Sequence, residues 1–161
     1  MKILELLASI LTSLSKYFRN FIKKKSEFDS NLFEKFLDEL PSNSPSIRFL
    51  AEHDIGTAYK KDELKDLYDF LYTWDNAEHE FKNRKLENLR KEFITKSYAF
   101  LGELAMNVWP VKNNPDFYSM HLSGRQYNKE RMERRDELNE KAIELYNIHQ
   151  NIVRMGNKKL K

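Results

Sequence analysis

Hydrophobic side chains recur every three or four positions along most of the chain, which is the period of an amphipathic α-helix. The first segment, residues 1–25, has its apolar positions at Ile3, Leu7, Leu11, Leu14, Phe18 and Phe21. A second helix is predicted to begin at Asp29 or Ser30, whose side chains can cap it, and to stop at Leu40 before Pro41.

Turn and capping residues divide the middle of the chain. Ser44 followed by Pro45 predicts a short helix over Ser46–His53, because proline is well tolerated at the first helical position. Asp62 is then expected to cap a helix that continues to Phe81. Asn83 is expected either to break this helix or to cap the next one.

Two long helices are predicted in the second half, Arg84–Trp109 and Asn128–Met155, with an irregular stretch over 111–127. The last helix repeats apolar positions by four and three, as in a heptad seam that suits packing inside a bundle or along a dimer axis. Gly156 is expected to follow its end, which leaves 157–161 as a basic tail.

No segment alternates with a period of two, so no β-sheet is predicted. Only four glycines and four prolines occur in 161 residues, which favours a few long elements. The sequence therefore predicts one all-α domain over residues 1–161, a bundle of about five or six helices with a long antiparallel pair. The helix over 1–25 is expected to pack on this bundle or to lie at its periphery.

Charge is unevenly distributed, although the net charge is only +3. Residues 1–25 sum to +5, residues 26–82 to −8 and residues 83–161 to +6. This segregation would let the parts attract each other within one fold or between copies. It also argues against a dedicated nucleic-acid binder, which carries a broad basic excess.

The chain contains no cysteine, which excludes disulfides, thiolate metal sites and a cysteine nucleophile. The composition fits a reducing cytoplasm, and the many Lys, Asn, Phe and Tyr residues suggest a bacterial gene. The uncharged run Leu6–Ser15 has ten residues, whereas a membrane-spanning helix needs about 20. No phosphate-binding glycine loop or other cofactor motif is present, so no cofactor is predicted.

One polar cluster is the candidate site. On a helix running to Phe81, Glu78 would interrupt the apolar stripe that contains Trp74, and a buried carboxylate needs a partner. The full candidate set is Arg48, His53, Asp54, Tyr68, Tyr72, Trp74, Asp75, Glu78 and His79. Two histidines among carboxylates could hold a divalent metal, but the spacing matches no established ligand pattern, and a structural polar network is the preferred interpretation.

Arg48 and His53 also fit the loose Arg-x(4–6)-His spacing of HEPN-type helical ribonucleases. A chain with this many arginines and histidines contains roughly 0.7 such pairs by chance, so the spacing identifies no family. Three functions are therefore left open by the sequence. The leading one is a helical interaction module that self-associates or binds a protein through an apolar helix face. The alternatives are attachment to a membrane surface through residues 1–25, and a metal-binding or hydrolytic role for the polar cluster.

Overall fold

The computed structural model describes the backbone of residues 2–120 and 129–160, and the side chains of residues 11–120 and 129–160. Most of the described chain is helical, which confirms the predicted class in its main feature. The α-helices within these described residues are α1 (Lys2–Glu39), α2 (Pro45–Glu52), α3 (Lys65–Trp74), α4 (Arg84–Asn107) and α5 (Lys129–Leu160). Short 3-10 helices lie on either side of α3, namely η1 (Lys61–Leu64) and η2 (Ala77–His79).

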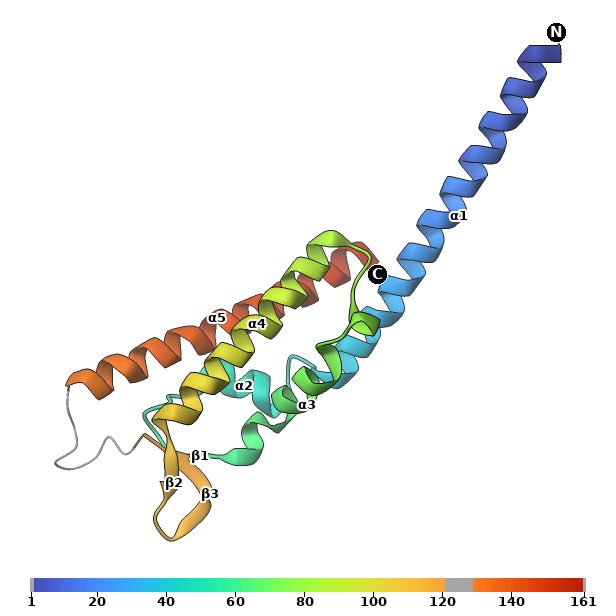
Figure 1. Cartoon of the computed structure of the whole chain (residues 1–161). Coiled ribbons are helices and arrows are strands. Elements are labelled where there is room, and N and C mark those ends of the chain that lie inside the picture. The colour runs from blue at the N-terminus through green and yellow to red at the C-terminus, as the bar shows by residue number, and fades with distance from the viewer. Residues whose placement is uncertain (1, 121–128, 161) are drawn as a thin grey trace.

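The molecule consists of an elongated helical body and one helix that projects from it (Figure 1). Helices α4 and α5 lie side by side along the body, while α2, α3 and the C-terminal part of α1 complete it. Ion pairs join Lys96 to Glu144 and Glu103 to Lys141, so residue numbers rise along α4 while they fall along α5. The N-terminal part of α1 extends well beyond the body.

Helix α1 is continuous from Lys2 to Glu39, so the predicted division near Asp29 is wrong. Asp29 is buried and does not cap its own helix. Its two carboxylate oxygens accept hydrogen bonds from the backbone N–H groups of Lys82 and Asn83, at 2.6 and 2.7 Å. Asp29, which the local sequence predicted to cap its own helix, therefore accepts hydrogen bonds from a segment more than fifty positions away.

A small antiparallel sheet corrects the prediction that the chain contains no strands. Its strands β1 (Tyr59–Lys60), β2 (Trp109–Val111) and β3 (Asn114–Ser119) lie in the order β1-β3-β2. The β2–β3 hairpin occupies part of the stretch expected to be irregular, and Asn113 adopts a left-handed φ of 66° at its turn. Strands this short give too few positions for an alternating pattern to be recognised. Residues 121–127 of that stretch lie outside the described residues.

Helix ends were predicted with mixed success. Helix α2 begins at Pro45 after Ser44, as expected, and Ser44 caps it by accepting a hydrogen bond from the Ile47 N–H. Of the two roles left open for Asn83, the structure shows that it caps α4. Asp62, however, lies inside η1 rather than capping α3, and α3 ends at Trp74 instead of continuing to Phe81. Helix α4 ends at Asn107, two residues before the predicted Trp109, because Trp109 begins strand β2.

Gly156 lies inside α5, so its predicted role after the helix end is wrong, and residues 157–160 are helical rather than a separate tail. A Cβ atom built at Gly156 would overlap the ring of Phe33, which shows that α1 and α5 cross closely here. At the end of the same helix, the Leu160 carbonyl accepts a hydrogen bond from Ser30 Oγ, at 3.2 Å. The body thus covers α1 from about residue 29 to its C-terminal end.

The hydrophobic core uses one face of each helix. The heptad positions of α5 are all buried against the body, and they are Leu138, Ala142, Leu145, His149 and Ile152. Of the two roles that the sequence left open for this seam, the structure therefore shows packing inside the body. No helix among the described residues is both long enough and apolar enough to cross a membrane.

Candidate functional site

The nine residues predicted to form one cluster are divided among three parts of the molecule, mainly because α3 ends at Trp74. Residues that a continuous helix would have aligned are instead separated by a turn. The three parts are the end of α2 (Arg48, His53, Asp54), a groove between α3 and α4 (Tyr68, Tyr72), and the turn after α3 (Trp74, Asp75, Glu78, His79).

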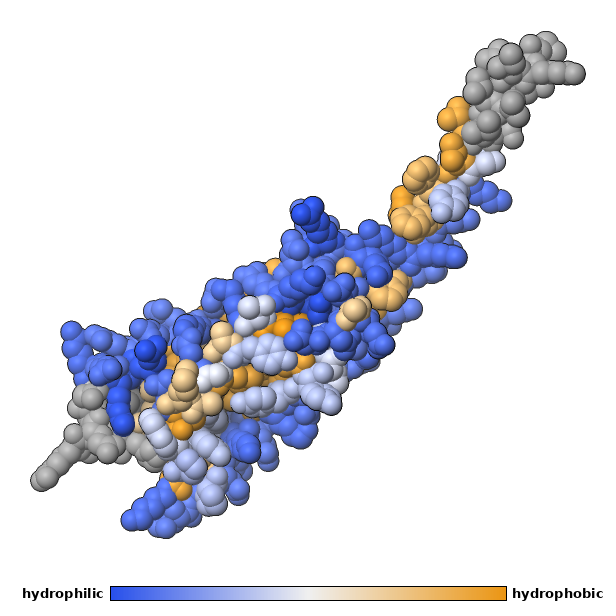
Figure 2. All heavy atoms as spheres, viewed as in Figure 1, coloured by the Kyte–Doolittle hydropathy of each residue, from blue (hydrophilic) through white to orange (hydrophobic). Residues whose placement is uncertain are grey.

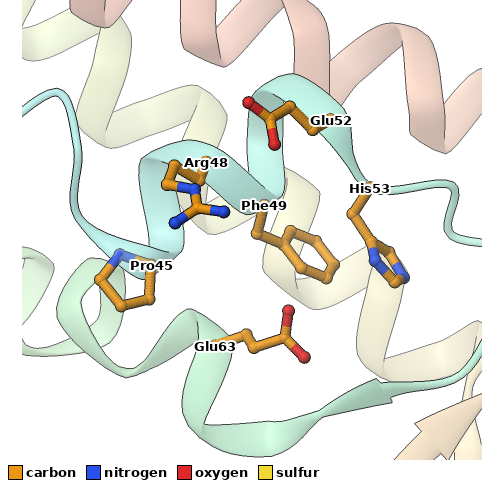
Figure 3. A pocket seen from close by; sticks show the side chains of 6 residues that line it. All are labelled: Pro45, Arg48, Phe49, Glu52, His53 and Glu63. Carbon is orange, nitrogen blue, oxygen red and sulfur yellow. The ribbon is translucent and has the colours of Figure 1, made fainter.

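A cleft of about 380 Å³ lies beside α2. Its lining residues are Pro45, Arg48, Phe49, Glu52, His53 and Glu63. The His53 ring stacks on the Phe49 ring at 4.5 Å between centroids, and Glu63 Oε1 accepts a hydrogen bond from the Lys60 N–H at 2.8 Å. Figure 3 shows the Phe49 ring between the side chains of Arg48 and His53. The predicted guanidinium and imidazole therefore do not converge on one point.

Asp54 stabilises the loop that follows α2. Its Oδ1 accepts hydrogen bonds from the Gly56 N–H at 2.9 Å and from Asn139 Nδ2 at 3.1 Å. The bond from Asn139, followed by the bond from Gly56, holds the pKa of Asp54 below its ordinary value. Asn139 Oδ1 in turn accepts a hydrogen bond from the Ile55 N–H, so this carboxylate belongs to a structural link between the loop and α5.

His79 is buried in the turn after α3, and both of its ring nitrogens are engaged. Lys35 Nζ lies 2.8 Å from Nε2, and Asn76 Oδ1 lies 2.9 Å from Nδ1. Because an ammonium group can only donate, Nε2 accepts and Nδ1 carries the proton that it donates to Asn76. Burial, followed by the charge of Lys35, lowers the pKa of His79, so the ring is held neutral as a structural group.

Glu78 is exposed, contrary to the expectation of a buried carboxylate in an apolar stripe. The difference arises at Asn76, whose side chain forms hydrogen bonds with backbone groups on both sides of the turn after α3. Its Nδ2 donates to the Thr73 carbonyl at 2.6 Å, and its Oδ1 accepts from the Glu78 N–H at 2.9 Å. The dipeptide Asp75-Asn76 is the sequence signal for this turn, since both residue types favour turns over helix interiors.

Glu87 and Arg90 form a buried ion pair that the sequence reasoning did not predict. Arg90 Nε and Nη2 donate to the two Glu87 carboxylate oxygens at 2.9 and 2.7 Å, and Arg90 Nη1 donates to the Trp74 carbonyl at 2.6 Å. Glu87 also accepts from the Phe81 N–H at 2.9 Å. Burial alone would raise the pKa of Glu87, but the bonds from Arg90 and Phe81 outweigh it and lower the pKa.

These contacts assign the turn after α3 a structural role. Glu87 and Arg90 satisfy backbone groups at both ends of the turn, and Asp29 satisfies two more immediately after it. Within residues 11–120 and 129–160, no three His, Asp or Glu side chains are arranged to hold a metal ion. The nine candidate residues are therefore not brought together as one set of metal ligands.

A second hollow is apolar and aromatic. It has a volume of about 470 Å³, and its lining residues are Tyr68, Leu71, Tyr72, Tyr98, Leu101 and Gly102. Tyr98 spans the groove and donates a hydrogen bond to the Leu71 carbonyl at 3.4 Å. The two predicted residues Tyr68 and Tyr72 thus face an exposed groove and are separated from His53 and His79.

An uncovered apolar surface lies on the projecting part of α1, residues 11–28, which we call the arm. Every side chain of the arm is exposed. Seven of them are large and hydrophobic, and they are Leu11, Leu14, Tyr17, Phe18, Phe21, Ile22 and Phe28. Figure 2 shows orange and pale side chains along the helix where it extends beyond the body. The expectation that this helix packs on the bundle is therefore wrong for residues 11–28.

The apolar side chains of the arm lie on one face. Their spacing places them mostly within one side of a helix that turns by 100° per residue. The same side continues into the body, where Leu32, Phe33 and Phe36 are buried. The polar side carries the exposed bases Lys16, Arg19 and Lys23. The arm is therefore an amphipathic helix whose apolar face has no covering element among the described residues.

No known protein family matches the chain, and no curated protein or solved structure shows detectable similarity to it.

Proposed function

We propose that this protein is a non-enzymatic interaction module and that the arm is its binding element. One observation carries the proposal. A single face of α1 is buried where the body meets it and is left uncovered over residues 11–28, although it remains apolar. Contiguous apolar surface of this kind marks sites that bind proteins or membranes.

The energetics of the arm support this proposal. Fully burying one Leu, Ile or Phe side chain contributes about 1.5–3 kcal/mol, so covering several of the arm's seven large hydrophobic residues gives a substantial driving force for association. An isolated helix also has little stability of its own in water, whereas contact along one face stabilises it. The helices of the body, by contrast, bury most of their apolar positions, including the heptad positions of α5.

Self-association through the arm is a second candidate, favoured by the spacing of its apolar residues. Leu11, Leu14, Phe18 and Phe21 alternate by three and four, the repeat that lets two helices pack along a common seam. A dimer of this kind would show a concentration-dependent sedimentation coefficient. The metal-binding or hydrolytic alternative has no comparable support, because its residues do not converge.

Binding to nonionic dodecyl maltoside micelles tests the proposal, because these micelles offer the arm an apolar phase that carries no charge. The full chain is expected to co-elute with micelles in size-exclusion chromatography. The triple variant Leu14→Ser, Phe18→Ser, Phe21→Ser removes apolar surface from the arm and is expected to elute alone. The matched control Ser13→Ala, Lys16→Gln, Asn20→Ala alters the opposite side of the same helix and should bind as the parent chain does.

Two results would contradict the proposal. One is a parent chain that ignores micelles and also remains monomeric at high concentration. The other is equal binding by the parent chain and the Ser variant, which would place the binding surface outside the arm. Because the altered residues contact nothing in the body, circular dichroism should show both variants folded.

A further inference from the structure

The arm combines its apolar face with an unusual excess of positive charge. Residues 1–25 sum to +5, and the exposed basic side chains within the arm are Lys16, Arg19, Lys23, Lys24 and Lys25. No carboxylate pairs with any of them among the side chains that the structure describes. A partner that covers this helix must therefore offer negative charge beside an apolar interior.

We propose that the arm lies on the surface of a membrane that contains anionic lipids, with its apolar face below the headgroups. This inference rests on the proposed function and adds the identity of the partner. Helices that lie in a membrane interface typically carry Lys and Arg on the polar side and Phe and Leu on the apolar side. The arm has this composition over 18 residues, a length of about 27 Å.

The arrangement of charge favours a lipid surface over a second copy of the chain. Two paired arms would bring like charges together, and the heptad spacing would place Lys25 in their seam between Phe21 and Phe28. On a membrane the same lysine can extend its ammonium group to the headgroups while its methylene chain contacts apolar surface. Basic side chains on the polar side lie no further than about one helix diameter, ~10 Å, from the headgroups, a distance comparable with the Debye length of about 8 Å at physiological salt.

Aromatic side chains in the middle of the arm suit the boundary between water and lipid. Tyr17 lies beside the apolar face and its ring contacts Phe18 edge-on, at 6.3 Å between centroids. A tyrosine placed there can bury its ring while its hydroxyl stays hydrated. Residues 26–82 sum to −8, so an anionic surface would attract the arm and repel this part of the body. That contrast predicts a chain anchored by α1 with its acidic region held in solution.

The absence of cysteine favours a reducing compartment, and the cytoplasmic leaflet is the membrane face that carries negative surface potential. The inference therefore agrees with the cytoplasmic location expected from composition. It requires no change in the body, since residues 11–28 already present both the apolar and the basic side chains.

Vesicle flotation with the full chain tests the inference. Binding to phosphatidylcholine vesicles that contain phosphatidylserine should exceed binding to pure phosphatidylcholine, and added salt should reduce it. Replacing three bases, Lys23→Gln, Lys24→Gln and Lys25→Gln, should weaken partitioning onto the anionic vesicles about 100-fold, because each basic residue near such a surface contributes about a fivefold factor. The same variant should still bind dodecyl maltoside micelles.

A matched control removes equal charge from exposed positions in the body. The variant Lys61→Gln, Lys112→Gln, Lys129→Gln changes exposed lysines in η1, in the β2–β3 turn and at the start of α5, at the end of the body opposite the arm (Figure 1). It should partition within about twofold of the parent chain, because charges more than a Debye length from the membrane contact are screened. Equal binding to both vesicle types would overturn the anionic-lipid inference and leave the proposed function standing. Vesicle binding that is absent while the parent chain dimerises would show that a second copy covers the arm. A parent chain that binds neither micelles nor vesicles and does not dimerise would contradict the proposed function as well.

Discussion

Phe18 and Phe36 lie on the same side of α1, because 18 residues correspond to five complete turns of an α-helix. Phe36 is completely buried between α3 and α5, with its ring 5.5 Å from Trp74 and 5.3 Å from His149. Phe18 is 59% exposed. One helix face thus has two environments, since its C-terminal part belongs to the core and residues 11–28 are exposed.

Alanine substitution should distinguish these two environments. Phe36→Ala is expected to lower the free energy of unfolding by about 3–5 kcal/mol, because it leaves a cavity in a packed aromatic cluster. Phe18→Ala should change it by no more than about 0.5 kcal/mol, since no contact in the body is lost. Urea denaturation followed by circular dichroism measures both values. A comparable loss in the two variants would contradict the division of α1 into a core half and an arm.

Asp29 is expected to contribute strongly to the free energy of unfolding, because it is buried and accepts two backbone hydrogen bonds. Asp29→Ala leaves the Lys82 and Asn83 N–H groups without their acceptor, which should cost about 1–3 kcal/mol. Asp38→Ala removes an exposed carboxylate from the same helix and serves as the control, with an expected change within about 0.5 kcal/mol. Equal stabilities of the two variants in urea would show that the bonds to Asp29 are not significant.

The Glu87–Arg90 pair should behave as a coupled unit in a double-mutant cycle. Glu87→Leu or Arg90→Met alone leaves one buried charge unpaired and is expected to cost about 3–5 kcal/mol. The double variant should cost less than the sum of the two. The exposed pair Lys96–Glu144 provides the comparison, with an expected coupling of about 0–1 kcal/mol. Additive losses at Glu87 and Arg90 would contradict the coupling.

Acid should destabilise the protein through its buried histidines. His149 donates from Nε2 to the Leu40 carbonyl at 2.9 Å and accepts from Gln150 at Nδ1, so the buried ring is neutral. Burial lowers the pKa of His149 below its ordinary 6.5, against an opposing effect of the Leu40 carbonyl, and the pKa of His79 is lowered as well.

The unfolded chain therefore binds these protons more readily, and the stability that the neutral rings provide is fully present above about pH 6.5. Below that pH the free energy of unfolding should fall, by at most about 1.4 kcal/mol per pH unit for each histidine. Urea titrations at several pH values between 5 and 7.5 (roughly the range in which histidine titrates) measure the slope. The double variant His79→Asn, His149→Gln should show a flatter dependence, and an unchanged slope would exclude these two residues as its origin.

Two glycines in helices should respond in opposite directions to the same substitution. Gly156→Ala forces a methyl group into the ring of Phe33 and is expected to cost about 1–3 kcal/mol. Gly102→Ala meets no atom within 4 Å and should stabilise α4 by about 0.5–1 kcal/mol, since alanine favours the helix. Thermal unfolding compares the two variants with the parent chain. A stabilising Gly156→Ala would contradict the close crossing of α1 and α5.

The candidate site shows where sequence reasoning reached its limit. Placing Glu78 in an apolar stripe depended on α3 continuing to Phe81, yet the side chain of Asn76 shapes a turn directly after Trp74. The charged pair that is buried, Glu87 and Arg90, looks like part of a solvated helix surface when only its spacing is considered. Its burial depends on backbone groups of Trp74 and Phe81, which a local pattern does not reveal.

Local regularities in the sequence were sufficient to predict the helical class, the amphipathic character of residues 11–25, the helix start at Ser44 and a helix boundary at Asn83. Each of these follows from the geometry of a single helix and its first turn, which depends on residues only a few positions apart. The sequence could not determine which part of the apolar stripe on α1 is covered, because residues 11–21 and 32–40 follow the same pattern. Only the tertiary structure decided this. α5 ends beside Ser30, so the packing that buries Phe36 stops there and leaves Phe18 exposed.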